Sequence, residues 1–308
     1  MTTAPTPHEP DPLEPVGQQH GFPAPSAQDE ARWLQQGEAL LRSPDHDRDL
    51  HDVTATIVDL DHPTGHLLRF TAALPEHVAG PDWAARNVTI RMELGPGYDE
   101  ASRVYTIRRY HPVTGTVEVD VVLHGATSPM MRWSRDLRPG SSLRFRGPRQ
   151  HFIVPDFPDR PVALFLDATA VPALLTMLEQ WTHRAGGVGW VQTDDLAAFE
   201  ELPAVPGLDL HRIDPTAEEP GALLRRAALV ERPEGCVVWG AGERDDMRAL
   251  RRYFRSEVGL PKDHLALYGY WKRGTTNTEI DMRRLANYAR LVETGGSLED
   301  VDDLAIEI

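Results

Sequence analysis

The sequence predicts a two-domain protein in which an antiparallel β-barrel is followed by a doubly wound α/β domain with a parallel sheet. Three observations lead to this prediction. The chain has 308 residues, which suits two domains of ordinary size. Apolar and polar residues alternate in several short segments up to about residue 158, as in antiparallel strands. After that point apolar strand segments alternate with helical ones, as in a parallel sheet.

The first 45 residues are predicted to be a disordered arm that carries a short helix. Residues 1–28 contain seven prolines among polar residues, and such a composition buries too little apolar surface to offset the entropy of ordering. Residues 29–43 have apolar positions at helical spacing.

The segment 46–158 is predicted to form the barrel. Its expected strands are separated by clusters of Gly, Pro and Asp, and they cover residues 53–57, 88–94, 117–121 and 143–145, with a further strand around Arg103. Several short strands at this spacing favour a small barrel.

The segment 159–274 is predicted to form the α/β domain, and 275–308 an acidic helical extension. The expected strands are 162–166, 189–193, 236–240 and 265–270, and the expected helices are 169–185, 217–229, 243–258 and 279–291.

Composition excludes several classes of protein. The net charge of −15 argues against broad binding to nucleic acid or anionic membranes. Residues 101–150 are the exception, because they hold nine arginines and three acids, which suggests an anionic ligand. The single cysteine excludes an intrachain disulfide framework. No apolar run is long enough for a membrane span and no signal peptide pattern is present, so we expect a cytoplasmic protein.

The sequence also lacks the common motifs of other enzyme classes. The 13 histidines show no metal-ligand spacing, so no bound metal is expected. Neither a Gly-x-Ser-x-Gly nor a Walker pattern is present, so hydrolases and nucleoside triphosphatases lack support.

Two groups of candidate residues lie in the barrel segment. Arg103, Tyr105 and Thr106 can pair a phosphate, stack on a flat heterocycle and hydrogen-bond a ring nitrogen, although such residues are also ordinary in a surface strand. The segment 123–133 leads through a Gly turn into a Pro-started helix whose backbone N–H groups can bind an anion. The alternative is a plain connection with Trp133 in the core.

Three further groups follow predicted strands of the second domain, where ligands of such sheets bind. Asp167 and Thr169 open the first crossover, although either is equally suited to cap a helix. No Gly-x-Gly-x-x-Gly follows this strand, which disfavours an ordinary Rossmann dehydrogenase. The other two groups are Ala241-Gly242-Glu243 and Tyr270-Trp271-Lys272-Arg273.

Taken together and in this order, these motifs resemble the siderophore-interacting protein family of ferric-siderophore reductases, which are related to the ferredoxin reductase fold. The resemblance covers about residues 50–274. The matching residues are Arg103, Tyr105, Thr106 and Arg108, then His124 and Gly125, Gly147-Pro148-Arg149, Asp167, Thr169, Ala170, Pro172 and Ala173, Ala241-Gly242-Glu243, and Tyr270-Trp271-Lys272-Arg273-Gly274.

The resemblance implies an FAD-binding barrel and an NAD(P)H-binding α/β domain. Tyr105 and Thr106 would be the catalytic residues. FAD would lie between Arg103, Tyr105, Thr106 and the 124–133 loop, and NAD(P)H against the second domain. The implied cofactor-binding residues are Arg103, Tyr105, Thr106, His124, Gly125, Ser128, Trp133, Asp167, Thr169, Ala241, Gly242, Glu243, Tyr270 and Trp271. The anionic ferric siderophore would be held by Lys272, Arg273 and Arg149. The chain departs from the family pattern at Ser128, Met130 and Ala168.

The function implied by the resemblance is NAD(P)H-dependent, FAD-mediated reduction of a ferric siderophore, which releases Fe(II). Asp194 and Asp195 follow the second strand of the α/β segment, where an acid favours a ribose hydroxyl and hence NADH. Two alternatives are a non-catalytic siderophore-binding module and a flavin reductase that serves another electron acceptor. We expect a monomer or weak oligomer.

Overall fold

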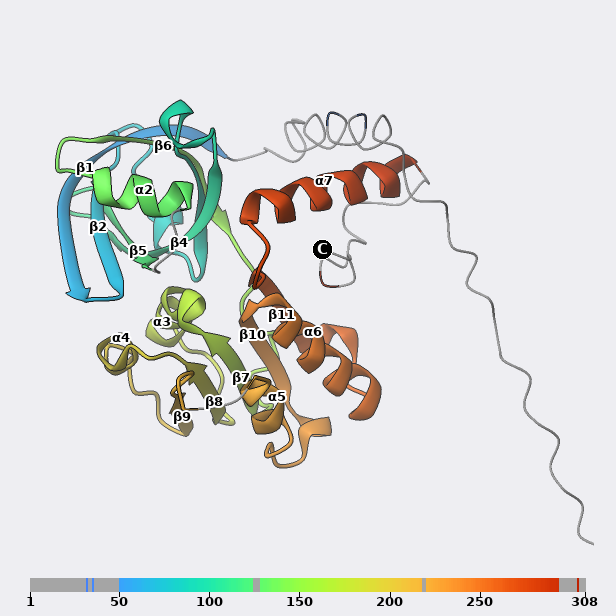
Figure 1. Ribbon diagram of the computed structural model, residues 1–308. Coiled ribbons are helices and arrows are strands. Elements are labelled where there is room, and N and C mark those ends of the chain that lie inside the picture. Colours follow the sequence, from blue (N-terminus) through green and yellow to red (C-terminus); the bar gives the residue numbers. More distant parts are fainter. Residues whose placement is uncertain are drawn as a thin grey trace, which may run out of the picture.

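In a computed structural model, the chain forms a six-stranded barrel followed by a five-stranded sheet covered by helices (Figure 1). The structure describes residues 50–123, 128–217 and 220–293, and the single positions 32, 35 and 304. The helix expected over 29–43 lies outside the described residues except for positions 32 and 35.

The barrel is closed and antiparallel, with the strand order β1-β2-β5-β4-β3-β6. Its interior is filled by the apolar residues that alternate along each strand, which is why the sequence shows a period of two. Helix α2 (Pro129–Asp136) lies across one side of the barrel (Figure 1). The strands are β1 (His51–Thr64), β2 (Leu67–Ala73), β3 (Val88–Glu93), β4 (Ser102–His111), β5 (Thr116–Val122) and β6 (Ser142–Gln150).

The second sheet is parallel, with the order β11-β10-β7-β8-β9. Strands β8 and β9 are added on one side of β7, and β10 and β11 are then added on its other side, so the order of the strands changes direction between β7 and β10. Both faces are buried. Its strands are β7 (Val162–Asp167), β8 (Gly187–Gln192), β9 (Leu208–Ile213), β10 (Val237–Glu243) and β11 (Leu265–Trp271), and its helices are α3 (Val171–Glu179), α4 (Leu196–Glu200), α5 (Ala222–Ala227) and α6 (Arg244–Arg252).

Helix α3 is the element that joins the two halves. Eight of its nine residues are buried, because one side packs on the sheet and the other on β4 of the barrel. A helix that is apolar all round needs such cover on both sides. Across this junction the backbone N–H of Asn87 donates to Thr176 Oγ1 at 2.9 Å.

Helix α7 (Asn277–Glu293) follows β11, begins beside the barrel and runs away from it (Figure 1). Among the described residues, no helix has both the length and the hydropathy that crossing a membrane requires.

Several predicted bounds differ from the structure. The expected helix 169–185 is shorter, since a 3-10 turn at Ala168–Ala170 precedes α3. The expected helix 243–258 ends at Arg252 and continues as a π-helical turn, Tyr253–Glu257, and the expected helix 217–229 forms only over Ala222–Ala227. Strands β2 and β9 and helix α4 were not predicted.

Candidate cofactor and substrate site

Strand β4, which carries the three candidate residues Arg103, Tyr105 and Thr106, packs against α3. Antiparallel pairing sets Arg103 opposite Met92 and Thr106 opposite Thr89. Because neighbouring strand residues alternate, Arg103 and Tyr105 share one face and Thr106 lies on the other, as the sequence predicts. Arg103 and Thr106 are each 7% exposed.

Burial changes the pKa values of Arg103 and Tyr105. Desolvation lowers the pKa of Arg103, and the nearby Asp281 carboxylate opposes that shift. The Arg103 guanidinium donates through Nη1 to the Ser102 carbonyl at 2.6 Å. Burial raises the pKa of Tyr105, so its phenol stays neutral and its ring offers an apolar face at the junction.

Asp167 binds together the carboxyl ends of three strands. Its Oδ1 accepts from the Thr169 N–H at 2.9 Å and from Thr169 Oγ1 at 2.5 Å. Its Oδ2 accepts from the Glu243 N–H at 2.8 Å and from Trp271 Nε1 at 2.7 Å. Burial raises the pKa of Asp167, and the four donors oppose the rise. Gly242 permits this arrangement, since a Cβ there would lie 2.5 Å from Asp167 Oδ2.

Glu243 caps helix α6 and also holds the end of β11. Its Oε2 accepts from the N–H groups of Asp245 and Asp246, at 2.7 and 3.1 Å, and its Oε1 accepts from the Arg273 N–H at 3.1 Å. Asp246 lies in the same first turn. Burial, and then the carboxylates of Glu243 and Asp167, raise the pKa of Asp246 to about 6.

The segment after β11 supplies the candidate cations. Lys272 Nζ lies 3.6 Å from Asp245 Oδ1. The Arg273 side chain is exposed and lowers the pKa of the nearby Asp246. Arg149, the third predicted cation, lies on β6 opposite Thr89, in the barrel.

An aromatic cluster joins the end of β6 to β11. The ring of Phe152 stacks on Tyr268, with centroids 4.2 Å apart and an interplanar angle of 7°. His151 meets Tyr268 and Tyr270 edge-on at 5.4 and 6.0 Å. Tyr270 is therefore part of the contact between the two domains.

Helix α7 contacts both domains beside this site. Asp281 Oδ2 lies 3.5 Å from Arg91 Nη1 of β3, and Arg284 Nη2 donates to the Gly269 carbonyl of β11 at 3.0 Å. Asp281 and Arg284 also pair with each other at 3.6 Å. The sequence analysis missed Arg91 and Asp281, because 190 residues separate them and no local pattern marks the pair.

Of the residues predicted to bind the cofactor in the 124–133 segment, Ser128 and Trp133 are described by the structure. His124 and Gly125 lie outside the described residues. Ser128 caps α2, its Oγ accepting from the Met131 N–H at 3.3 Å, so its hydroxyl hydrogen can still be donated. Trp133 is 6% exposed and packs edge-on against Phe70 in the barrel core. Met130 is also in this core.

Acids from elsewhere in the chain neutralise much of the basic stretch 101–150. Arg108 pairs with Asp120 at 3.3 Å and with Glu201 at 2.9 Å, and Arg109 pairs with Glu179 at 2.8 Å. Glu201 and Glu179 belong to the second domain. Arg108 and Arg109 therefore form ion pairs between the two domains, and the expectation of an anionic ligand on this stretch stays a prediction.

Asp195 also has a structural role that the sequence did not reveal. Its Oδ1 caps α4 by accepting from the Ala198 N–H at 3.0 Å, and its Oδ2 accepts from Thr64 Oγ1 of the barrel. Both carboxylate oxygens are engaged, which leaves the exposed Asp194 as the acid free to meet a ribose.

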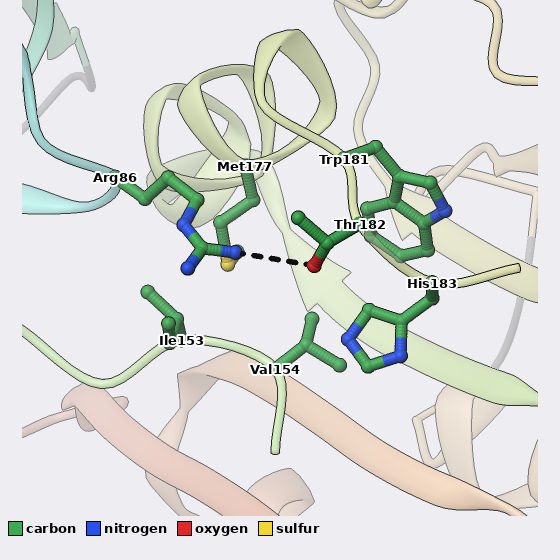
Figure 2. A pocket seen from close by; sticks show the side chains of 7 residues that line it. All are labelled: Arg86, Ile153, Val154, Met177, Trp181, Thr182 and His183. Atoms are coloured by element: carbon green, nitrogen blue, oxygen red, sulfur yellow. Dashed lines mark hydrogen bonds between the residues drawn. The ribbon is translucent and has the colours of Figure 1, made fainter. Parts of the chain in front are cut away.

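The described part of the chain holds two hollows away from these residues. A cavity of about 10 Å³ between the domains is lined by Arg86, Met177, Trp181 and His183 among others (Figure 2), which is room for about one water molecule. A hollow of about 290 Å³ lies between α2 and the start of the barrel. Neither is lined by the β4 or Asp167 groups. No group of three or more His, Cys, Asp or Glu side chains in the described ranges is arranged to hold a metal ion.

Comparison with known proteins identifies the family. The family model of the siderophore-interacting FAD-binding domain matches residues 64–152, and that of the siderophore-interacting protein matches residues 160–274. The chain belongs to the siderophore-interacting protein family. Its barrel corresponds to the family's FAD-binding domain, and the fold is that of the ferredoxin reductases.

Individual relatives agree with this assignment. This siderophore-interacting protein is 31% identical to the ferric acinetobactin reductase of Acinetobacter baumannii over 270 residues, which are 86% of this chain and 94% of the relative. It is 26% identical to the ferric vibriobactin reductase of Vibrio cholerae over 188 residues, 59% of this chain and 68% of the relative.

Solved structures show the same architecture. The siderophore-interacting protein of Acinetobacter baumannii superposes with a TM-score of 0.75 at 30% identity and covers 80% of this chain and all of that chain. The ferredoxin reductase of carbazole 1,9a-dioxygenase has a TM-score of 0.52 at 17% identity, covering 72% of this chain and 70% of that one, so it shares the fold.

The donor set at the junction suits FAD. A flavin dinucleotide requires a cation for its diphosphate, a flat apolar face for its ring system and donors for the ring heteroatoms. Arg103, Tyr105 and Thr106 supply these three from one strand, β4, and the Ser128 hydroxyl adds a donor at a helix N-terminus.

Proposed function

We propose that this protein uses NADH or NADPH to reduce the iron of a ferric siderophore through FAD, releasing Fe(II). The observation that carries the proposal is the contact of β4, the strand that holds Arg103, Tyr105 and Thr106, with α3, the helix that follows the Asp167 strand end. The strand with the flavin-type donors and the sheet edge proposed for nicotinamide are thus joined through α3. The ferric-siderophore reductases among the relatives support the same reaction.

The residues have distinct roles in this proposal. Arg103 and the Ser128 hydroxyl hold the diphosphate, while Tyr105 and Thr106 position and hydrogen-bond the ring. Trp271, fixed by its bond to Asp167 Oδ2, lines the nicotinamide side with Thr169 and Gly242. Bound FAD supplies the conversion of a two-electron hydride donor into two one-electron transfers. The balance is one NAD(P)H and two Fe(III) giving NAD(P)⁺, one proton and two Fe(II).

The iron leaves because its oxidation state changes. Hydroxamate and catecholate oxygens are hard ligands that hold Fe(III) far more tightly than Fe(II), so reduction weakens the complex. Lys272, Arg273 and Arg149 are the proposed contacts for the siderophore. A supply of reduced nicotinamide places the reaction in the cytoplasm.

We propose NADH as the preferred donor. Asp194 is exposed after β8, where a carboxylate binds a ribose hydroxyl and repels a 2′-phosphate. Arg212, which contacts the neighbouring Thr193, is already engaged, since its Nη1 donates to the Thr193 carbonyl at 2.9 Å and lies 3.6 Å from Asp214. Asp194→Ser should narrow the difference between NADH and NADPH in the rate of anaerobic flavin reduction.

The test of the function starts from the visible spectrum of the full chain after incubation with FAD and removal of the excess. We expect a flavin spectrum that bleaches on anaerobic addition of NADH and returns on addition of a ferric siderophore, with Fe(II) trapped by a colorimetric chelator. A protein that binds a gallium siderophore but retains no flavin would instead be a binding module. A flavin that bleaches and is not reoxidised by any ferric siderophore would favour a reductase with another acceptor.

A further inference from the structure

The cations proposed to hold the siderophore are accompanied by acids of the same sheet edge. Lys272 Nζ lies 3.6 Å from Asp245 Oδ1, and Arg273 lies close enough to Asp246 to lower the pKa of that carboxyl. Asp167 and Glu243 stand behind them at the ends of β7 and β10. Asp245 thus pairs with Lys272, Asp246 lies near Arg273, and Glu243 accepts from the Arg273 N–H.

Two further arginines near this edge are committed to the protein. Arg284 donates to the Gly269 carbonyl and pairs with Asp281. Arg244 is fully buried beneath Gly269, whose missing side chain makes room for it, since a Cβ there would lie 2.8 Å from Arg244 Cγ. Neither side chain adds positive charge at the exposed surface of Lys272 and Arg273.

The causes of the raised pKa of Asp246 indicate the sign of the electrostatic potential at this position. Burial is the largest cause of its raised pKa, and the carboxylates of Glu243, Asp167 and Asp245 add to it, whereas Arg273 opposes it. The net effect of the neighbouring charges at this position is therefore unfavourable to a further negative charge.

Siderophores differ in the charge that they bring to such a site. Three hydroxamates carry one negative charge each, so their Fe(III) complex is neutral. Three catecholates carry two each, so theirs is a trianion. Within about 8 Å, each unit of negative charge on the protein disfavours a trianion by about 1 kcal/mol and leaves a neutral complex nearly unaffected.

We propose that Asp245 and Asp246 set the substrate class of this protein, by neutralising Lys272 and Arg273 so that the site selects neutral ferric complexes of the hydroxamate type over trianionic tris-catecholates. This inference rests on the proposed function and on the siderophore contacts given there.

The test measures binding of gallium(III) complexes to the FAD-loaded full chain, because Ga(III) has nearly the charge and size of Fe(III) and is not reduced. Ga(III)-ferrichrome is the neutral probe and Ga(III)-enterobactin the trianionic one. We expect wild type to bind the neutral probe at least tenfold more tightly. Asp245→Asn and Asp246→Asn should each tighten binding of the trianion roughly three- to tenfold and change the neutral probe by less than twofold.

Asp263→Asn is the matched control. Asp263 is exposed and precedes β11, so it lies about 20 Å from the site, at the other end of that strand, and its substitution changes the net charge equally. Equal or tighter binding of the trianion by wild type, or an equal response of the trianion to Asp263→Asn, would overturn the inference.

The same samples separate this inference from the function on which it rests. If ferric complexes of either charge reoxidise the reduced flavin but the trianion binds best, the function stands and the charge selection is wrong. If NADH bleaches the flavin and neither gallium complex binds, the siderophore function fails, and the inference fails with it.

Discussion

Asp167 accepts four hydrogen bonds with two oxygens, so its replacement by Asn should destabilise the whole strand edge. An amide can accept on one side only, which leaves its NH₂ facing either Thr169 or the Glu243 N–H and Trp271 Nε1. We expect Asp167→Asn to lower the free energy of unfolding by about 1 to 3 kcal/mol in urea denaturation. Asp194→Asn, an exposed acid of the same domain, should change it by less than about 0.5 kcal/mol.

The raised pKa of Asp246 predicts that the stability of the protein depends on pH. Its pKa in the folded protein is about 6, above the value near 4 of an unfolded chain. The folded state therefore binds more protons between these values, and this group makes stability fall as pH rises from about 4 to 6. Asp246→Asn should thus be more stable than wild type at pH 8 by about 1 kcal/mol, after allowance for solvent screening.

That advantage of Asp246→Asn should vanish near pH 3, below both pKa values, where the wild-type carboxyl is protonated in both states. Thermal unfolding at the two pH values measures it, with Asp263→Asn as the variant that should lack the effect. An equal shift at both pH values would contradict the assignment.

The sequence identified most of these residues but not what each of them contacts. The sequence offers two interpretations of Asp167 and Thr169, a helix cap and a nicotinamide site. The structure shows the cap, because Asp167 accepts from the Thr169 N–H and hydroxyl, and the nicotinamide site stays a prediction that is compatible with it. Asp246 carried no signal, because its raised pKa comes first from burial and then from Glu243 and Asp167, and only the folded chain buries Asp246 and brings Asp167 near.

At the scale of elements, α7 carries a negative charge, the Asp281 carboxylate, beside the predicted diphosphate site. Asp281 faces Arg91 and opposes the lowered pKa of Arg103, so it competes with the diphosphate for the same cations. Asp281→Asn should lower the Kd for FAD about two- to fivefold in a fluorescence titration. Glu293→Gln, at the far end of α7, removes the same charge and should leave the Kd unchanged. Weaker FAD binding by Asp281→Asn would show that the acid organises the arginines instead.

Each element that sequence reasoning missed has a physical reason for being hidden. In β2 the adjacent Leu67 and Leu68 are both buried, which hides the alternation. Strand β9 is an edge strand with polar side chains at Asp209, His211 and Arg212. Helix α4 has five residues, which is too short for a helical period to show. The long, regularly patterned elements were found.

At the scale of the molecule, Glu201 ties the domains together. It bonds Arg69 at 2.8 and 3.0 Å and Arg108 at 2.9 Å, both on the barrel. Its side chain is 35% exposed, so Glu201→Gln should cost about 1 to 2 kcal/mol at neutral pH. Glu200→Gln, its exposed neighbour, is the matched control.

This contribution should also depend on pH. The hydrogen bond from Arg69 lowers the pKa of Glu201 in the folded protein, so its stabilisation is present above the unfolded pKa and is lost as pH falls through the folded one. The difference between wild type and Glu201→Gln should therefore shrink below about pH 4. A constant difference from pH 3 to pH 7 in denaturant unfolding would argue against the ion pairs as its source.

The closure of the barrel has a consequence for biosynthesis. Because β1 pairs with β6, every strand of the barrel lies within residues 51–150, and domains fold in order as the ribosome delivers them. Strand β11 is the last strand in the described part of the chain and an edge of its sheet, so Trp271 and Arg273 reach Asp167 and Glu243 only after the other described strands have been made. A nascent chain can therefore fold the FAD-binding barrel well before the sheet edge proposed to bind the nicotinamide has formed. A product cut short before residue 271 would keep the barrel and lack that edge.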